Sequence, residues 1–293
     1  MACLMLQQAA EAGQTRVVAP EALGRFDRQQ LPEASGIIRS RRHPGIYWVH
    51  NDSGNAPWLF AVRRDGSIVR RFRLAFPNID WEAVSTDDAG HLYIGDTGNN
   101  TGLLRVRTIY QIDEPDPAAP EDPARDRPLK ASNTFAYVLP QGNRFDAEGL
   151  FVDRGRAVVV AKYLDRREAE LFAVALDGEP TARTAPVRPV RSLGRLAGFT
   201  EPVTGADLSP DGTMLAVCSS AVTYVYRRAA GGEKWEPLAK LHYTPRPIEG
   251  IAWDGRDLIL AAEDGQGLFL LTEARWRTHL TGAAAPRPRM IRP

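Results

Sequence analysis

Short apolar segments separated by polar turns recur along the whole chain. Each unit reads as an inner strand, a glycine turn, a strongly apolar strand, a polar loop and a third strand. The inner strands are expected to open at Ser35, Glu82, Glu148, Ala206 and Glu249. Asp-Gly pairs at 211–212 and 254–255 stand between two apolar runs, which is a strong hairpin signal. The pattern therefore predicts repeated antiparallel sheets.

The remaining strands follow the same repeat. Second strands are expected at 46–49, 92–94, 158–161, 214–217 and 258–261, third strands at 58–62, 108–112, 171–174, 223–226 and 268–271, and fourth strands at 68–74, 134–139, 189–196 and 238–243. No comparably long segment has a 3.6-residue period. Four-stranded units repeating every 40–65 residues or so are typical of propeller blades.

These units predict an all-β fold, a β-propeller of four-stranded blades, within a single domain spanning residues 15–281. Five blades account for the repeats, and the segment 16–26 is expected to supply the outer strand that closes the fifth. Six blades are an alternative if residues 276–280 belong to a further, degenerate blade.

Three segments depart from the repeat. Residues 1–14 start with a short apolar run, without basic residues before it, and read either as a disordered N-terminus or as the remnant of an export signal. The proline-rich insertion 113–130 interrupts the second blade and is expected to be polyproline-like or disordered. Residues 282–293, rich in Ala, Pro and Arg, are expected to form a flexible tail.

The bulk composition excludes some partners and leaves others open. The chain has 293 residues and a formal net charge of +1, and its basic residues are scattered along the sequence. We therefore expect no nucleic-acid partner, and no apolar stretch is long enough to span a membrane. Cys3 and Cys218 do not suggest a structural disulfide. The compartment is open, with a periplasmic or secreted location favoured over the cytoplasm, and a monomer is expected.

The propeller topology brings distant residues to one face. The start of each inner strand and the end of each second strand meet at the same mouth of the central channel. The inner strands open on the carboxylates Glu33, Asp80, Glu82, Asp146, Glu148 and Glu249. Because residues i and i+2 of a strand point the same way, each Asp-x-Glu pair can aim both carboxylates together. In the fourth blade Asp207 stands one residue off, on the other side of the pleat.

Polar residues also end the second strands. They are His50, Asn51, Asp52, Asp96, Asn99, Lys162, Tyr163 and Glu263. Glu82 and Asp96 are fourteen residues apart, as are Glu148 and Lys162. The equal spacing supports the alignment of the blades.

Carboxylates facing one axis repel each other, so the mouth needs compensation. A bound cation, raised pKa values and the base Lys162 are the possibilities. Oxygen ligands favour Ca²⁺ or Mg²⁺, for which the candidate ligands are Glu33, Glu82, Glu148 and Glu249. The structural alternative has three parts. The glutamates would bind backbone N–H groups of the next blade, the segments 96–100 and 51–54 would be Asx-turns, and His50 would be a hydrogen-bonded loop histidine.

Four motifs carry a family resemblance. They are DWEA (80–83), LYIGDTGNN (92–100), DAEGL (146–150) and TGADLSPDG (204–212). With them, residues 30–270 resemble a family of bacterial propellers grouped with TolB-like and phytase-like β-propellers. A more distant likeness is to gluconolactonase and paraoxonase propellers, which hold calcium in the channel and whose first-blade Glu would correspond to Glu33. Their other Asn and Asp ligands have no clear counterpart here.

Two functions fit these residues. The first is a binding module that recognises a protein, peptide, glycan or small molecule through Asn51, Asp52, Asp80, Asp96, Asn99, Asp146, Tyr163 and Glu263. The alternative is a metal-dependent hydrolase of a lactone, ester or phosphoester, with His50 as base and Lys162 holding an anionic substrate. No nucleophile motif or triad spacing decides between them.

Overall fold

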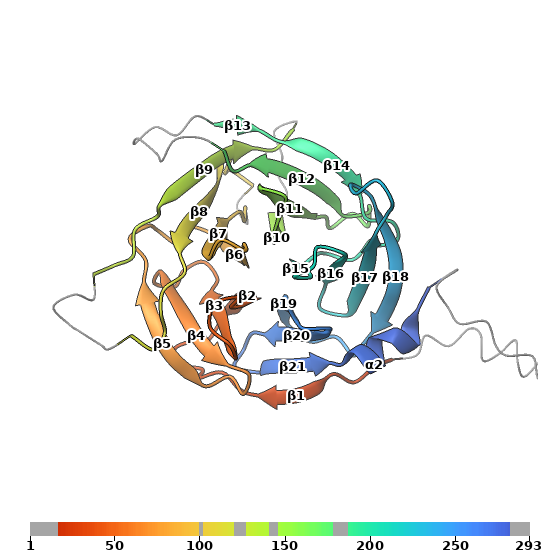
Figure 1. Cartoon of the computed structure of the whole chain (residues 1–293), viewed down its shortest axis with the longest axis horizontal. Helices are drawn as coiled ribbons and strands as arrows, with labels where there is room; N and C mark the ends of the chain where they lie inside the picture. The colour runs from red at the N-terminus through yellow and green to blue at the C-terminus, as the bar shows by residue number, and fades with distance from the viewer. Residues whose placement is uncertain (1–16, 100–101, 120–126, 141–145, 178–186, 282–293) are drawn as a thin grey trace, which may run out of the picture.

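A computed structural model describes residues 17–99, 102–119, 127–140, 146–177 and 187–281. Five sheets, antiparallel except for one parallel pairing in blade two, stand around a central channel, which confirms the five-bladed all-β propeller (Figure 1). The N-terminal residues 1–14 and the tail 282–293 lie outside the described residues. No helix in the described ranges has the length and apolar character needed to cross a bilayer.

The strands of each blade follow one another from the channel outwards. Blade one comprises β2 (Ala34–Arg39), β3 (Ile46–Asn51), β4 (Trp58–Arg63) and β5 (Ile68–Arg73). Blade two comprises β6 (Trp81–Thr86), β7 (His91–Asp96), β8 (Arg107–Asp113), β9 (Asn133–Val138) and the added β13 (Arg188–Pro189). Blade three comprises β10 (Asp146–Asp153), β11 (Arg156–Lys162), β12 (Glu170–Ala175) and β14 (Arg191–Arg195). Blade four comprises β15 (Gly205–Leu208), β16 (Met214–Cys218), β17 (Val222–Arg228) and β18 (Trp235–His242). Blade five comprises β19 (Ile248–Asp254), β20 (Asp257–Ala262), β21 (Gly267–Leu271) and β1 (Glu21–Gly24).

The N-terminal strand closes the ring, as the sequence predicted. β1 pairs with β21 antiparallel, with Ala22 opposite Phe269. The six-blade alternative is wrong, because Trp276 ends the short helix α2 (Glu273–Trp276) instead of starting a strand. Its buried ring lies 6.2 Å from that of Trp253, and its Nε1 donates a hydrogen bond of 2.9 Å to the carbonyl of Arg256.

The described ends of the insertion in blade two are bound to the propeller. Glu114 is buried, and its carboxylate accepts hydrogen bonds from Trp48 Nε1 at 2.7 Å and from Ser40 Oγ. At the other end, Leu129 donates its N–H to the carbonyl of Arg73 at 2.8 Å. Both ends of the insertion therefore contact blade one, while residues 120–126 are outside the described residues.

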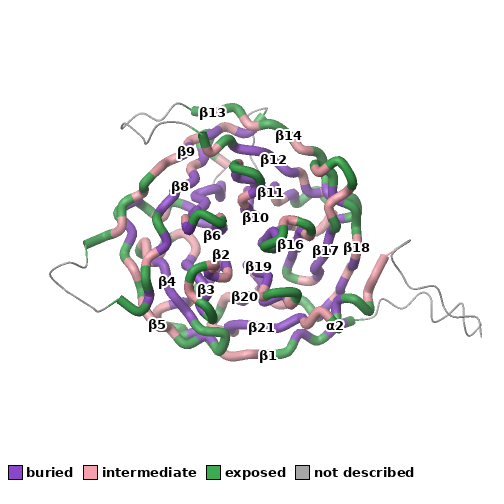
Figure 2. The backbone as a smooth tube through the Cα atoms, in the orientation of Figure 1, coloured by how far each residue is buried: buried purple, intermediate pink, exposed green. Residues whose placement is uncertain are grey.

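The core lies between the blades. Each of five apolar clusters fills the space between two neighbouring sheets, and the second strands, such as β20, are almost entirely buried. Figure 2 shows this burial around the channel, with exposed residues at turns and outer edges. Both faces of the second strands are covered by neighbouring blades, which explains why their sequences, such as that of β20, are nearly continuous apolar runs rather than alternating ones. A rigid frame thus fixes the channel mouth.

Candidate functional site: the acidic channel mouth

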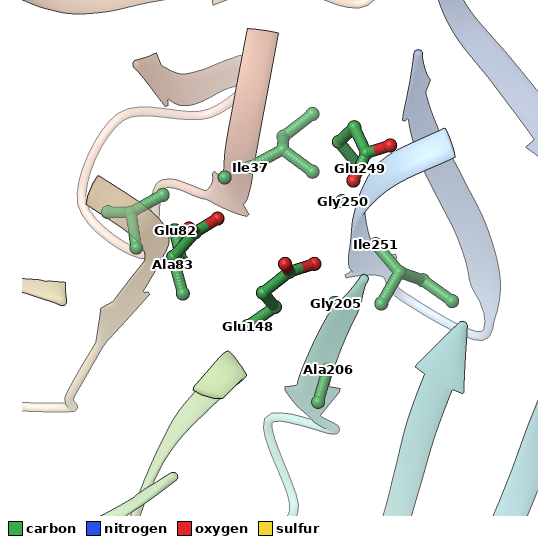
Figure 3. A pocket seen from close by; sticks show the side chains of 11 residues that line it. Ile37, Glu82, Ala83, Glu148, Gly205, Ala206, Glu249, Gly250 and Ile251 are labelled. Atoms are coloured by element: carbon green, nitrogen blue, oxygen red, sulfur yellow. The ribbon is translucent and has the colours of Figure 1, made fainter. Parts of the chain in front are cut away.

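Three glutamates of the inner strands occupy the extra position of a β-bulge. In β6, Trp81 and Ala83 pair with two consecutive residues of the second strand, so Glu82 between them has no cross-strand partner. Glu148 in β10 and Glu249 in β19 are unpaired in the same way. A bulge bends the strand and re-aims its extra side chain. Figure 3 shows the three carboxylates around one central space.

Small residues follow the bulges because the inner strands approach each other closely. A Cβ atom on Gly250 would lie 2.7 Å from the carbonyl oxygen of Ser35, and one on Gly149 would lie 2.8 Å from the Cβ of Ala206. A Cβ on Gly205 would lie 3.0 Å from the Cα of Gly250. Glycine is therefore needed for packing at these positions, and the glutamates stand at the point where the blades are closest.

The fourth blade differs from the expected alignment. Its strand opens at Gly205, opposite Cys218, and has no bulge. Thr204 therefore takes the place of a glutamate, and the expected alignment of Ala206 with the glutamates is two residues late. Asp207 lies on the other side of the pleat, as predicted, where its carboxylate accepts the N–H of Trp253 at 2.8 Å. The ring of acids is therefore uneven.

The space at the centre of the glutamates is small. It measures about 180 Å³, of which about 10 Å³ admits the centre of a water molecule. That is room for roughly one water molecule. The mouth can thus hold a bare cation or a water, whereas a larger ligand would have to bind above it.

Burial and mutual repulsion raise the pKa values of all three carboxyls. Burial, then the charges of Glu148, Asp52 and Asp80, raise the pKa of Glu82 well above its ordinary value. Burial raises the pKa of Glu249 to about 8, with Glu148 contributing. The pKa of Glu148 rises to about 7 for the same reason, despite the opposing effect of Lys162. The positive charge near the mouth therefore does not balance the negative charge of these carboxylates.

Lys162 is the base predicted to offset this charge, and it is paired. Its Nζ forms an ion pair and hydrogen bond with Glu148, whose side chain is 6% exposed. Burial disfavours the lysine cation, but the charge of Glu148, together with Glu82 and Glu249, outweighs burial and raises the pKa of Lys162. The lysine is therefore charged, and it stabilises one of the three glutamates directly.

A second group of carboxylates lies beside the ring. Oxygen atoms of Asp52, Asp80 and Glu82 all lie within 4.8 Å of one another. Gly98 is pressed against this group: a Cβ there would come within 2.3 Å of Glu82 Oε1 and 2.5 Å of Asp80 Oδ2. Among the predicted metal ligands, Glu82 thus lies beside Asp52 and Asp80, which were predicted to bind a ligand. Glu148 instead forms an ion pair with Lys162.

Glu82 has no partner of its own. Its residue is 5% exposed, and among the described residues no hydrogen bond or ion pair reaches its carboxylate. A buried, unpaired carboxylate is costly unless it is protonated or binds a cation. Glu82 points towards the mouth (Figure 3). It is the residue at which a cation would relieve most repulsion.

The ends of β7 and β10 hold the Asp80 segment in place. Asp96 Oδ1 accepts the N–H of Asp80 at 2.7 Å, and burial raises the pKa of Asp96 to about 6. Asp146 Oδ1 accepts the N–H of Asn99 at 2.5 Å. Asn99 Oδ1 accepts the N–H of Leu104 at 2.8 Å. The structure places these three predicted ligand-binding residues next to the carboxylate group, where they fix the backbone.

Other predicted residues lie further from the carboxylate group. Glu33 is exposed, and its Oε2 accepts a hydrogen bond of 2.6 Å from Asn55. Asn51 ties loop backbones together, since its Nδ2 donates to the carbonyl of Gln30 at 2.8 Å. Tyr163 is buried in the core between blades two and three. Glu263 is electrostatically coupled to the mouth, and burial raises its pKa.

His50 is enclosed in the wall between blades one and two. It is fully buried, its ring lies 5.6 Å from that of Trp81 in an edge-on arrangement, and burial lowers its pKa to about 4. Its Nδ1 lies 3.1 Å from the carbonyl oxygen of Asn51. A Cβ on Gly36 would touch its Nε2 at 2.6 Å. The histidine is neutral and faces protein atoms.

Two residues of the site were not singled out from the sequence. Asn78 donates through its amide to the carbonyl of Asp52 at 2.8 Å and accepts the N–H of Trp81 at 3.1 Å. Gly98 donates its N–H to the carbonyl of Asp80 at 3.0 Å. The glycine in the Asp-Thr-Gly-Asn segment was the available signal, since a turn glycine beside acids suits close backbone approach.

Comparisons with known proteins add little about function. No family model matches the chain, and no curated protein matches its sequence. Among solved structures, it is similar to the crystal structure of a nidogen/laminin complex (12% identity, TM-score 0.42, covering 82% of this chain and 76% of that one). It is also similar to a catalytically inactive variant of virginiamycin B lyase from Staphylococcus aureus with quinupristin (14% identity, TM-score 0.42, covering 82% and 66%). Likenesses at this level carry no argument about ligands or activity.

Proposed function

We propose that the protein is a propeller binding module whose channel mouth holds a divalent cation, Ca²⁺ or Mg²⁺, between Asp52, Asp80 and Glu82. The bound cation would take part in recognising a peptide, protein, glycan or small molecule above the mouth. The observation that carries the proposal is the buried, unpartnered carboxylate of Glu82 within 4.8 Å of two further carboxylate oxygens.

The chemistry of these donors suits a hard cation. All three are carboxylates, and backbone carbonyls of the adjoining loops can complete the shell, which is the ligand set of Ca²⁺ and Mg²⁺. Glu148 is paired with Lys162, whereas Glu82 lies beside the carboxylates of Asp52 and Asp80. We also propose a periplasmic or secreted location and a monomeric state. Calcium sites of extracellular proteins can be weak and fill at millimolar calcium concentrations.

One observation favours hydrolysis as a second candidate. Glu148 has a pKa of about 7 and lies beside the proposed cation site, where it could move a proton next to a Lewis acid. His50, buried and facing protein atoms, does not support the base role in this reading. Release of acid from lactone, ester and phosphoester substrates, measured with and without the cation, separates the two candidates.

Metal-dependent stability tests the proposal directly. The protein is freed of metal with a chelator and melted with and without CaCl₂ or MgCl₂. A cation present at 100 times its Kd adds about 2.7 kcal/mol to the free energy of unfolding, which raises Tm by several degrees.

Two variants locate the effect. Glu82→Gln should raise the Tm of the metal-free protein, because it removes a repelled carboxylate, and should abolish the shift caused by the cation. Glu33→Gln, which changes an exposed carboxylate on the same face, should keep the shift. A Tm unaffected by either cation in the wild-type protein would rule out the proposal.

A further inference from the structure

A groove lies on the outer edge of blade one, away from the channel. The groove is lined by β4, β5 and the end of the insertion. Its empty volume, including the part open to solvent, is about 880 Å³. The residues that line it include Trp58, Arg71, Phe72, Arg73, Arg127 and Leu129. In Figure 1, β5 forms the outermost strand of this blade.

The alternation of β5 builds the groove. Arg71 and Arg73 lie on the same face of the strand as Trp58, because Trp58 is the cross-strand partner of Arg73. The guanidinium of Arg71 lies 4.7 Å from the centre of the Trp58 ring. The indole therefore holds one guanidinium in a defined position through a cation–π contact.

The insertion adds a further arginine, Arg127, from a distant part of the chain. Leu129 forms a parallel bridge with Leu74, and its N–H and carbonyl bond to Arg73 and Ala75, both at 2.8 Å. This bridge fixes the residues just before it against β5. Arg127 is thereby brought beside Arg71 and Arg73.

These arginines differ from some others on the surface. Arg191 pairs with Glu233, and Arg227 pairs with Glu236. Within the described ranges, no carboxylate lies within 4.0 Å of the guanidinium groups of Arg71, Arg73 or Arg127; Arg71 has only a 3.5 Å hydrogen bond to the neutral amide of Gln30. As far as the described residues show, the groove therefore gathers three guanidinium groups that have no carboxylate partner.

We propose that this groove binds a tetrahedral oxyanion group, a phosphate or sulfate ester, carried by a small molecule or sugar. A guanidinium donates two parallel N–H groups that match two oxygens of such an anion, and several arginines can share its charge. The Trp58 ring supplies an apolar surface for the rest of the ligand, and the size of the groove is that of a small-molecule site. The site is independent of the cation at the channel mouth.

Calorimetric titration with inorganic pyrophosphate and with a sulfated disaccharide tests this site. The protein is kept metal-free, so that pyrophosphate does not bind a cation at the mouth. The variant Arg71→Gln/Arg73→Gln removes two guanidinium groups from the exposed face of an outer strand, and the control Arg191→Gln/Arg227→Gln removes two paired ones. Both double variants lower the net charge equally.

We expect saturable binding of at least one anion with a Kd of about 1 mM or lower. The groove variant should weaken it on the order of tenfold or more, and the control should not. Tighter binding of pyrophosphate would assign a phosphate ester, and tighter binding of the disaccharide a sulfate ester. The proposal is overturned if neither anion saturates by roughly 10 mM, a Kd range far weaker than arginine-clamped anions reach. Equal losses in both variants would also overturn it, since they would reflect net charge alone.

Discussion

Glu148 and Lys162 form an ion pair between the first two strands of blade three, with only 6% and 24% of their side chains exposed. The bulge in β10 aims Glu148 into the mouth, and Lys162 reaches it from β11. The same lysine interacts with Glu82 and Glu249. One cation therefore interacts with three buried or half-buried carboxylates, and the mouth keeps an excess of negative charge that a ligand can use.

Removing this lysine should destabilise the protein in a pH-dependent way. We predict that Lys162→Met lowers the free energy of unfolding at pH 8 by about 2 to 3 kcal/mol, less than for a fully buried pair because the lysine is partly exposed and Glu148 can take up a proton. At pH 5 the loss should shrink, since a protonated Glu148 no longer needs the cation. Urea denaturation of both proteins at the two pH values measures this.

The double variant Glu148→Gln/Lys162→Met is the control for that prediction. It removes both charges, so no unpaired carboxylate remains at this position, and it should recover most of the stability lost at pH 8. A single variant as unstable at pH 5 as at pH 8 would show that Lys162 acts through packing of its aliphatic chain instead of its charge.

The raised pKa values predict how stability depends on pH. A carboxyl whose pKa is higher in the folded state keeps a proton that the unfolded chain releases, so unfolding becomes easier as the pH rises through that interval. For Glu249 the interval runs from 4.5 to about 8, and for Glu148 from 4.5 to about 7. We expect the metal-free protein to lose stability steadily between pH 5 and pH 8.

Glu249→Gln isolates one carboxyl from this effect. The variant should be at least about 1 kcal/mol more stable than wild type at pH 8, since one unit of pKa shift corresponds to 1.36 kcal/mol, with a discount for the partial exposure of the side chain. Near pH 4.5 the two proteins should converge. Denaturation with guanidinium chloride at several pH values in this range measures how the free energy of unfolding changes with pH. A variant whose free energy of unfolding changes with pH in the same way as that of the wild type would contradict the raised pKa of Glu249.

The fold could be predicted because its information is local and repeated. Each blade repeats the same hairpin signals, so strand positions and closure by the N-terminal strand followed from the sequence alone. The common spacing from Glu82 to Asp96 and from Glu148 to Lys162 also indicated which side chains share a face. The glycine and alanine after the glutamates indicated crowding, which the inter-blade distances confirm.

The details of the site depend on contacts between blades, which the sequence does not encode locally. Spacing alone did not show that Glu82 groups with Asp52 and Asp80, because these residues belong to different blades. Blade four was aligned two residues late, with Ala206 in place of Thr204, because it lacks the bulge that the other inner strands have in this region. The arginines of blade one looked scattered because Arg127 joins them only through the bridge at Leu129.

Alanine substitutions at two glycines, Gly98 and Gly149, distinguish an effect on metal binding from an effect on packing. Gly98→Ala places a methyl group against the ends of two flexible carboxylates, so it should cost only about 1 kcal/mol in stability but should remove the shift in Tm caused by a cation. Gly149→Ala places its methyl group 2.8 Å from Val160 and Ala206, in the rigid contact between blades three and four. It should cost about 2 to 3 kcal/mol.

Thermal melts of both variants with and without CaCl₂ provide the comparison. Gly149→Ala should keep the cation-induced rise in Tm at its lower starting temperature, because Asp52, Asp80 and Glu82 are untouched. If Gly98→Ala keeps the full rise as well, the cation binds elsewhere on the protein, and the assignment to these three carboxylates fails.

Glu114 provides a test of whether the insertion is part of the folded frame. Its carboxylate accepts hydrogen bonds from Trp48 Nε1 and Ser40 Oγ, both buried in blade one. Glu114→Ala leaves these donors unsatisfied, and we expect a loss of about 2 to 4 kcal/mol in the free energy of unfolding. Asp116→Ala, two residues along in an exposed position, should change it by less than about 0.5 kcal/mol. Equal effects in urea denaturation would mean that the insertion only lies on the surface. The predicted difference would show that the hydrogen bonds of Glu114 to blade one stabilise the folded protein.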